Sequence, residues 1–313
     1  MNENRTSTAD GDWESTDCLL CGSPRRETVV EAKVEVPGEP GTRTRPVAVV
    51  RCGECGLCYT RPRPTRETIG RFYPADYAPH QVRRSGKPSA LGSGWRRATG
   101  RRDWERDGPP MRGRRRLLDF GCGGGAFLQR MHHRGWNALG VDASAAVVGR
   151  IRDELGLPAV AGDLGSPELE REGFDVVTML QSLEHVHGPL EALRQARKLL
   201  APGGRLYVWV PNIEGLPFRW FGPGWFGLDL PRHLVHFSPA TLKRMVAAAG
   251  FRPLRLRMVR HSSWMKQSAL SARRMAQNTL AARVLTFRPL CRLLTRYCAL
   301  RGRADCMVLE AGR

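Results

Sequence analysis

A loop of five residues, Gly121-Cys-Gly-Gly-Gly125, constrains the fold of this chain more than any other feature of its sequence. It follows a short apolar run at 117–120 and precedes an amphipathic pattern over 126–134, which ends at Gly135. A glycine-rich turn between a strand and a helix lets the backbone approach a ligand closely at the helix N-terminus. The loop therefore predicts a ligand site at the carboxyl end of a parallel strand.

Strands and helices alternate through the rest of the middle of the chain. We expect further strands at 138–142, 158–162, 174–179, 205–210, 251–260 and 305–311, and helices at 144–155, 189–200 and 239–249. This spacing is typical of a doubly wound sheet, whose ligand lies over the C-terminal strand ends at the switch point. The predicted fold class is α/β, with a mostly parallel, seven-stranded, Rossmann-like sheet and a small module before it.

The glycine loop alone does not identify the ligand. Residues 121–126 fit the G-x-G-x-x-A dinucleotide fingerprint, and Asp142 lies 21 residues beyond the first glycine, where a ribose-binding acid belongs. A nucleotide with phosphates and one without both remain compatible with this pattern. An NAD(P) oxidoreductase is therefore one interpretation of the loop.

Four motifs in a fixed order favour another interpretation. They are D-x-G-x-G-x-G at 119–125, Gly-Asp at 162–163, Leu-Glu-His-Val at 183–186 and Leu-Leu-Ala-Pro-Gly-Gly at 199–204. Together they resemble the class I S-adenosylmethionine (SAM)-dependent methyltransferases over about residues 116–260. The whole chain looks like a bacterial group in which a four-cysteine module precedes such a domain, and residues 55–64 and 231–237 look typical of that group. The resemblance implies SAM as the cofactor and methyl transfer as the activity.

The resemblance also implies roles for individual residues. Asp119 and the loop glycines Gly121, Gly123 and Gly125 would hold the methionine part of SAM. Asp142 would accept hydrogen bonds from both ribose hydroxyls, because a carboxylate offers two oxygens. An N-cap or a surface position is the structural alternative for each acid.

Further residues complete the expected SAM site. Asp163 and Leu164 would meet the adenine edge, and Gln181 would lie beside the methionine moiety. The domain is similar to ubiquinone-pathway O-methyltransferases, in which an acid at the position of Gln181 joins the Glu184-His185 pair around a divalent metal. Because Gln181 is a neutral and weaker ligand, the sequence argues against metal assistance.

Three histidines are candidate catalytic residues. SAM carries its own electrophile, so the protein supplies proximity, orientation and, for a hydroxyl or carbon acid, a base. His185 follows the expected fourth strand, and His233 and His236 lie in a loop after the fifth. A neutral imidazole near pH 7 suits proton removal. The alternative for each histidine is a structural hydrogen bond.

The segment 217–237 holds six of the 23 aromatic residues of the chain, together with three glycines that allow hinging. We expect a lid over the acceptor, with a buried packing loop as the alternative.

Four cysteines near the N-terminus form a pair of C-x2-C turns separated by 30 residues. Two such turns supply the four thiolates of a closed structural zinc site, formed by Cys18, Cys21, Cys52 and Cys55. A glycine follows the second cysteine of each turn, where a tight turn needs backbone freedom. We therefore expect a zinc ribbon with a structural role, recognition of substrate or nucleic acid being the alternative. Cys58 is expected to be a small, half-buried residue.

The net charge of +20 is concentrated in two segments. Residues 83–116 contain 12 basic and 3 acidic residues, and residues 252–313 contain 14 and 2. Two local basic segments around a neutral middle argue against a general polyanion-binding protein. Within the second segment, an arginine repeat at 288, 292 and 296 accompanies an apolar stripe, formed by Leu290, Leu293, Leu294 and Tyr297. Such a basic amphipathic helix could lie on an anionic membrane, pack on its own domain or form a dimer.

These patterns predict six parts of the chain. They are a disordered tail at 1–15, a zinc-ribbon-like module at 16–80, a basic linker or helix at 81–115 (with a helix around 95–104), the methyltransferase core at 116–260, basic amphipathic helices at 261–303 and the last strand of the core sheet at 304–313.

The predicted function is methyl transfer to a small-molecule or lipid-linked metabolite, with O- or C-methylation favoured over N-methylation. The alternatives are an RNA methyltransferase, against which the absence of an N-P-P-Y-type motif after the fourth strand argues, and a non-catalytic SAM-binding protein. The polar start of the chain and the lack of a long apolar run favour a cytoplasmic location, with peripheral contact at the inner membrane face as an option. The sequence identifies neither the acceptor, nor the methylated atom, nor the oligomeric state.

Overall fold

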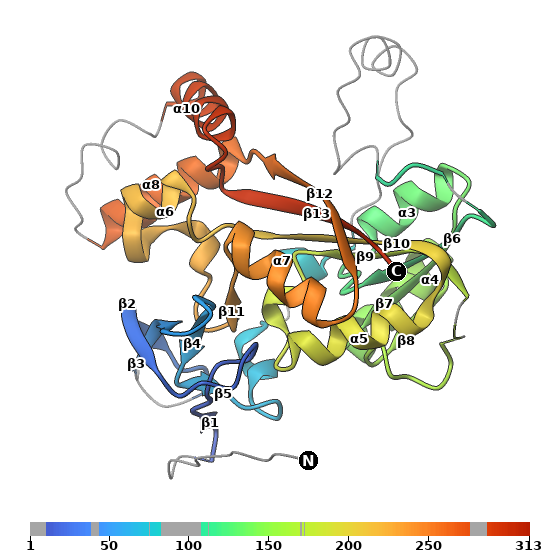
Figure 1. Cartoon of the computed structure of the whole chain (residues 1–313), viewed down its shortest axis with the longest axis horizontal. Coiled ribbons are helices and arrows are strands. Elements are labelled where there is room, and N and C mark those ends of the chain that lie inside the picture. Colours follow the sequence, from blue (N-terminus) through green and yellow to red (C-terminus); the bar gives the residue numbers. More distant parts are fainter. Residues whose placement is uncertain are drawn as a thin grey trace. The chain divides into compact units, whose positions relative to one another are not determined.

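The structure is a computed structural model, which describes residues 11–38, 44–74, 76–82, 108–111, 113–169, 171, 173–275 and 287–313. The chain, whose helices and strands are labelled in Figure 1, divides into two compact units. The first, here called the cysteine unit, comprises Met1–Pro74, Gln181–Glu191 and Trp209–Glu310. The second, the glycine-loop unit, comprises Ala75–Leu180, Ala192–Val208 and Ala311–Arg313. The segment Met1–Pro74, here called the cysteine-rich segment, thus belongs to the same unit as the C-terminal third of the chain. This grouping differs from the boundaries expected from sequence.

The seven-stranded sheet predicted from sequence is present. Its strand order is β12-β13-β10-β9-β6-β7-β8. The strands are β6 (Arg116–Phe120), β7 (Asn137–Asp142), β8 (Ala159–Ala161), β9 (Phe174–Leu180), β10 (Leu200–Pro211), β12 (Arg252–Val259) and β13 (Cys306–Gly312). The pairs β6–β7, β6–β9 and β7–β8 are parallel. Strands β7 and β8 follow β6 on one side of it, and the chain then returns to add β9 and β10 on the other side. This reversal of strand order at β6 is the topological switch point where such folds bind ligands.

Three helices follow strands of this sheet as expected. They are α3 (Ala126–His133), α4 (Ala145–Leu155) and α5 (Pro189–Leu199). Ser144 caps α4 by accepting from the amide of Val147, and Gly156 ends the helix in a left-handed conformation. β10 begins at Leu200, earlier than expected. The turn-like sequence at 201–204 is drawn into the strand, where the Gly204 carbonyl accepts from the amide of Arg313.

The cysteine unit contains two smaller sheets. A four-stranded sheet has the order β11-β4-β3-β2, from Val235–His236, Cys58–Arg61, Thr44–Cys52 and Arg26–Glu35. A second pair joins β1 (Trp13–Glu14) to β5 (Arg63–Pro64). Trp13 lies in the segment expected as a tail, and it packs on Val34, Val47 and Phe72. The strand β11 therefore brings residues near position 236 directly against the cysteine-rich segment.

The helices described in the cysteine unit are α6 (Leu216–Phe221), α7 (Pro239–Ala248), α8 (Ser262–Arg274) and α10 (Arg288–Leu300). Short 3-10 turns cover Ile69–Phe72, Leu183–His185, Gly222–Gly224 and Phe226–Leu228 in this unit, and Ala78–His80 in the glycine-loop unit. The aromatic segment 217–237 is largely core, because Phe221, Trp225 and Phe237 are buried. This burial matches the packing alternative rather than a lid.

The helix expected around 95–104 lies outside the described residues, as does most of the segment 81–115. Among the helices that the structure describes, none is long and apolar enough to cross a membrane.

Candidate functional site

The four cysteines of the two C-x2-C turns come together. The Sγ atoms of Cys18 and Cys55 are 3.3 Å apart, those of Cys21 and Cys52 are 3.6 Å apart, and all four lie within 4.8 Å of one another. Four thiolates at about 2.3 Å from a central zinc would be separated by roughly 3.8 Å. The donor set and spacing therefore fit one tetrahedral zinc ion.

The two turns also show why a glycine follows each second cysteine. Gly22 and Gly56 have φ values of 73° and 77°, and their amides donate to the carbonyls of Cys18 and Cys52. A side chain would be strained in this left-handed conformation. Cys58 is fully buried, not half-buried as expected, and stays outside the four-thiolate cluster.

In the glycine-loop unit, Asp142 ties the glycine loop to the next helix. Its Oδ2 accepts from the amide of Gly123 at 3.0 Å, and its Oδ1 accepts from the amide of Ser144 at 3.0 Å. Asp119 is buried on the adjacent strand, and its Oδ1 accepts from the hydroxyl of Thr178 at 2.7 Å. Burial raises the pKa of Asp119 to about 7. The two acids thus lie at the carboxyl ends of neighbouring parallel strands, as predicted.

Asp163 and Leu164 differ in their surroundings. Asp163 is exposed, and its Oδ1 accepts from the amide of Gly165 at 2.8 Å in a local turn. Leu164 is buried. Gly162 donates to the carbonyl of Asp142 at 2.9 Å, which keeps this turn beside the end of β7.

A short segment at 77–82, which sequence reasoning missed, packs on the glycine loop. The carbonyl of Pro79 accepts from the amide of Gly124 at 2.8 Å. A Cβ at Gly124 would lie 2.1 Å from the carbonyl oxygen of Gln81. The close approach of this segment therefore requires glycine at that position, in addition to any requirement from a ligand.

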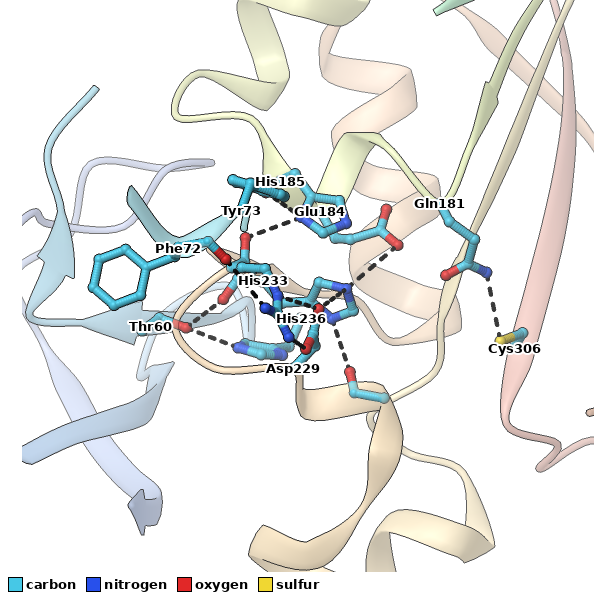
Figure 2. A network of polar contacts seen from close by, with 12 residues as sticks. Thr60, Phe72, Tyr73, Gln181, Glu184, His185, Asp229, His233, His236 and Cys306 are labelled. Carbon is cyan, nitrogen blue, oxygen red and sulfur yellow. Dashed lines mark hydrogen bonds and ion pairs between the residues drawn. The ribbon is translucent and has the colours of Figure 1, made fainter. Parts of the chain in front are cut away.

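In the cysteine unit, the three predicted histidines come together (Figure 2). The rings of His185 and His233 meet edge to face at 4.6 Å between centroids, and those of His233 and His236 are 6.4 Å apart. Glu184 and Asp229 complete this group, here called the histidine cluster. The Nε2 atom of His233 lies 4.0 Å from Glu184 Oε1 and 3.9 Å from Asp229 Oδ2.

Backbone acceptors assign the tautomers of the first two histidines. Nδ1 of His185 lies 3.1 Å from the carbonyl oxygen of Arg232, and Nδ1 of His233 lies 2.9 Å from that of Gly227. Each Nδ1 therefore carries the proton, and each neutral ring has its lone pair at Nε2. Burial lowers the pKa of His185 to about 3 and also lowers that of His233, against the opposing effect of Asp229. Both rings are therefore neutral near pH 7.

His236 is held differently. The Thr60 hydroxyl donates to the His233 carbonyl at 2.7 Å, so its oxygen accepts from Nε2 of His236 at 3.0 Å. Burial lowers the pKa of His236 to about 3. Its Nε2–H is used by Thr60, which gives this histidine the structural role that was the alternative.

Glu184 is the most deeply buried acid of the histidine cluster. It is 0% exposed, and its Oε2 has no hydrogen-bond partner among the described residues. With its amide nitrogen toward Glu184, Gln181 donates to Oε1 at 3.0 Å and accepts from the Trp209 indole at 3.1 Å. The opposite amide orientation, drawn in Figure 2, places that nitrogen 3.6 Å from Sγ of Cys306. Burial raises the pKa of Glu184 to about 8.

The cysteine-rich segment supplies partners that sequence reasoning also missed. The hydroxyl of Tyr73 lies 2.9 Å from Nδ1 of His185. Arg232 donates to the carbonyl of Phe72 at 3.1 Å and forms an ion pair with Asp229. Although burial opposes it, this ion pair lowers the pKa of Asp229. The cysteine-rich segment therefore helps to build the histidine cluster.

The burial of Glu184 makes stability depend on pH. Its folded pKa of about 8 lies above the ordinary 4.5, so the unfolded chain ionises first as pH rises. The wild type should lose stability relative to Glu184→Gln between these pH values, by at most about 5 kcal/mol. Urea unfolding of both proteins at several pH values measures the difference. A difference that does not change with pH would contradict this expectation.

Comparison with known proteins supports the methyltransferase interpretation of the sequence motifs. A family model described as "Methyltransferase domain" matches residues 94–256, just over half of the chain. The ubiquinone biosynthesis O-methyltransferase of Aeromonas salmonicida is 31% identical over 162 residues, which cover 48% of this chain and 68% of that protein. The protein of the same name from Ralstonia nicotianae is 29% identical, over 55% of this chain and 76% of its own.

Solved structures give more distant matches. A SAM-dependent methyltransferase from Archaeoglobus fulgidus is 18% identical, with a TM-score of 0.45, and the match covers 71% of this chain and 93% of that one.

Proposed function

Because the chain belongs to the methyltransferase-domain family and is a SAM-dependent methyltransferase, we propose that it methylates an oxygen or carbon atom of a small-molecule or lipid-linked acceptor. The observation that carries this proposal is the histidine cluster. Two neutral imidazoles, the half-buried His185 and the buried His233, each keep a lone pair at Nε2, and both lie near the buried Glu184. An acceptor that must lose a proton, such as a hydroxyl or a carbon acid, needs such a base.

We assign SAM to the glycine-loop unit. When bound, SAM supplies a methyl group on a cationic sulfur. Asp142 and the loop of 121–125 would hold its ribose and methionine parts, and Leu164 and Asp163 would contact the adenine. The buried Asp142 carboxylate suits this role, because each oxygen accepts only one backbone amide among the described residues and retains a second lone pair.

The chain's own residues would then take up the proton that the methyl acceptor loses. His185 Nε2 would accept it, while the Nδ1–H contacts to the Arg232 carbonyl and the Tyr73 oxygen would orient the ring and stabilise the imidazolium. His233 Nε2 is the second candidate base.

Ligand atoms of Glu184, His185 and His233 lie within 4.8 Å of one another, a spacing that could hold a metal ion, but the third acid of similar O-methyltransferases is replaced here by the neutral Gln181. The Gln181 amide donates to Glu184 Oε1, while Oε2 has no hydrogen-bond partner among the described residues. We therefore assign the cluster to proton transfer and derive no step through a metal. The zinc ion that we assign to the four cysteines would be structural.

The test is transfer of isotopically labelled methyl from SAM into a cell extract, read by mass spectrometry. Label in a small or lipid-linked product supports the proposal. Label only in RNA would favour the RNA methyltransferase alternative. SAM binding without transfer to any acceptor would favour the non-catalytic one.

Tyr73→Phe should lower kcat by about tenfold, because it removes one hydrogen-bonding partner of His185. Calorimetry should show unchanged SAM binding. Tyr59→Phe provides the matched control, since the buried hydroxyl of Tyr59 has no hydrogen-bond partner among the described residues. An unchanged kcat for Tyr73→Phe would remove this tyrosine from the catalytic model.

A further inference from the structure

Helix α10 buries small residues and leaves three of its large apolar residues, Leu293, Tyr297 and Leu300, exposed. Its buried positions are Cys291, Thr295 and Cys298. Leu293 and Leu300 are 64% and 80% exposed. A surface helix normally buries its largest apolar side chains. The apolar stripe expected from sequence is thus split, because Leu290 and Leu294 pack against the core while Leu293 and Tyr297 face outward.

The exposed side of α10 combines apolar and cationic groups. Arg292, Leu293, Arg296, Tyr297 and Leu300 are all exposed, and their spacing places them in one stripe along the helix, here called the α10 stripe. Helix α8 packs beside α10 (Figure 1). Of the nine large apolar side chains exposed in the described part of the chain, six belong to α8, α10 or the residue flanking each. The exposed apolar surface is therefore concentrated here.

The surrounding sequence has an unusual charge. From residue 230 to residue 304 there are 16 Lys and Arg residues and no Asp or Glu. Neither α8 nor α10 therefore contains a carboxylate that could neutralise the stripe. A partner for this surface must be anionic and must also accept apolar side chains.

We propose that the α10 stripe docks on the surface of an anionic lipid bilayer. Arginines in such a stripe pair with lipid headgroups, while Leu293, Tyr297 and Leu300 enter the boundary between headgroups and acyl chains. The helix would lie in the plane of the membrane, since its 13 residues are too few to span it.

Two other occupants fit less well. In a twofold dimer through this stripe, arginines would face arginines, and neither α8 nor α10 carries an acid to compensate them. A nucleic acid would engage the arginines through its phosphates but would leave Leu293 and Leu300 without apolar contacts.

This inference deepens the proposed function and rests on it in one respect only. If the enzyme methylates a lipid-linked acceptor, docking brings it to the surface where that acceptor lies. Membrane binding itself requires neither SAM nor an acceptor, so the two proposals can fail separately.

The test is co-sedimentation of the full chain with vesicles of phosphatidylcholine alone or mixed with phosphatidylglycerol. We expect binding only to the mixed vesicles and weakening by salt. The double substitution Leu293→Ser with Tyr297→Ser should weaken binding at least about tenfold. Arg292→Glu and Arg296→Glu should each weaken it by about fivefold or more.

Leu254→Ser is the matched control, because Leu254 is an exposed leucine of the same unit that lies on β12. Thermal melting of each variant verifies that it is folded. Equal binding to both kinds of vesicle would overturn the proposal, as would full binding by the Leu293→Ser, Tyr297→Ser variant. A chain that is dimeric in solution and becomes monomeric in that variant would assign the stripe to a second copy. Binding of bulk RNA, without vesicle binding, would assign it to nucleic acid.

Discussion

Asp142→Ala should weaken SAM binding by at least about 100-fold, because it removes a carboxylate that we assign to both ribose hydroxyls. Hydrogen bonds to a charged group contribute about 1.5–3 kcal/mol each, and two of them correspond to this loss or more. The same carboxylate holds the amides of Gly123 and Ser144, so the substitution also loosens the glycine loop. Calorimetry with SAM and with its demethylated product measures the effect.

Two variants separate binding from folding at this site. Asp142→Asn keeps one acceptor oxygen, so its affinity should lie between those of the wild type and Asp142→Ala. Asp153→Ala removes an exposed acid from helix α4 of the same unit and should change affinity little. The assignment of SAM to this unit would be wrong if folded Asp142→Ala bound SAM as tightly as the wild type.

The sheet and the assembly of the histidines could be predicted from sequence for a physical reason. The apolar strands and glycine-ended helices are local patterns, and successive parallel strands place their carboxyl ends at one edge. His185 follows the fourth strand of the core, and the segment carrying His233 and His236 follows the fifth. Their convergence follows from this topology.

The partners of the histidines could not be predicted, because they depend on pairing between distant parts of the chain. Strand β4 pairs with β11, which sets Thr60 against His236 at a separation of 176 residues. No local pattern around Tyr73 indicates that its hydroxyl meets His185. Similarly, the periodicity of α10 revealed a stripe but not which side is buried, since that depends on the small residues facing its neighbours.

Removal of zinc should have the largest effect on stability. Structural zinc sites contribute roughly 10–16 kcal/mol to the folding of small modules. Cys52→Ser, or prolonged chelation, should therefore unfold the segment that carries β2, β3 and β4. Because this segment supplies Thr60 and Tyr73 to the histidine cluster, methyl transfer should fall with it. SAM binding, which we assign to the glycine-loop unit, should be affected much less.

The matched control is Cys58→Ala, which removes a buried cysteine that does not belong to the four-thiolate cluster. Elemental analysis should find one zinc per chain in the wild type and in this variant, and little in Cys52→Ser. Thermal melting, methyl transfer and calorimetry with SAM are then measured on the same preparations. If zinc-free protein kept its melting temperature and its turnover, neither the metal nor the cysteine-rich segment would support the histidine cluster. A loss of SAM binding as large as the loss of turnover would instead show that the two units depend on each other for folding.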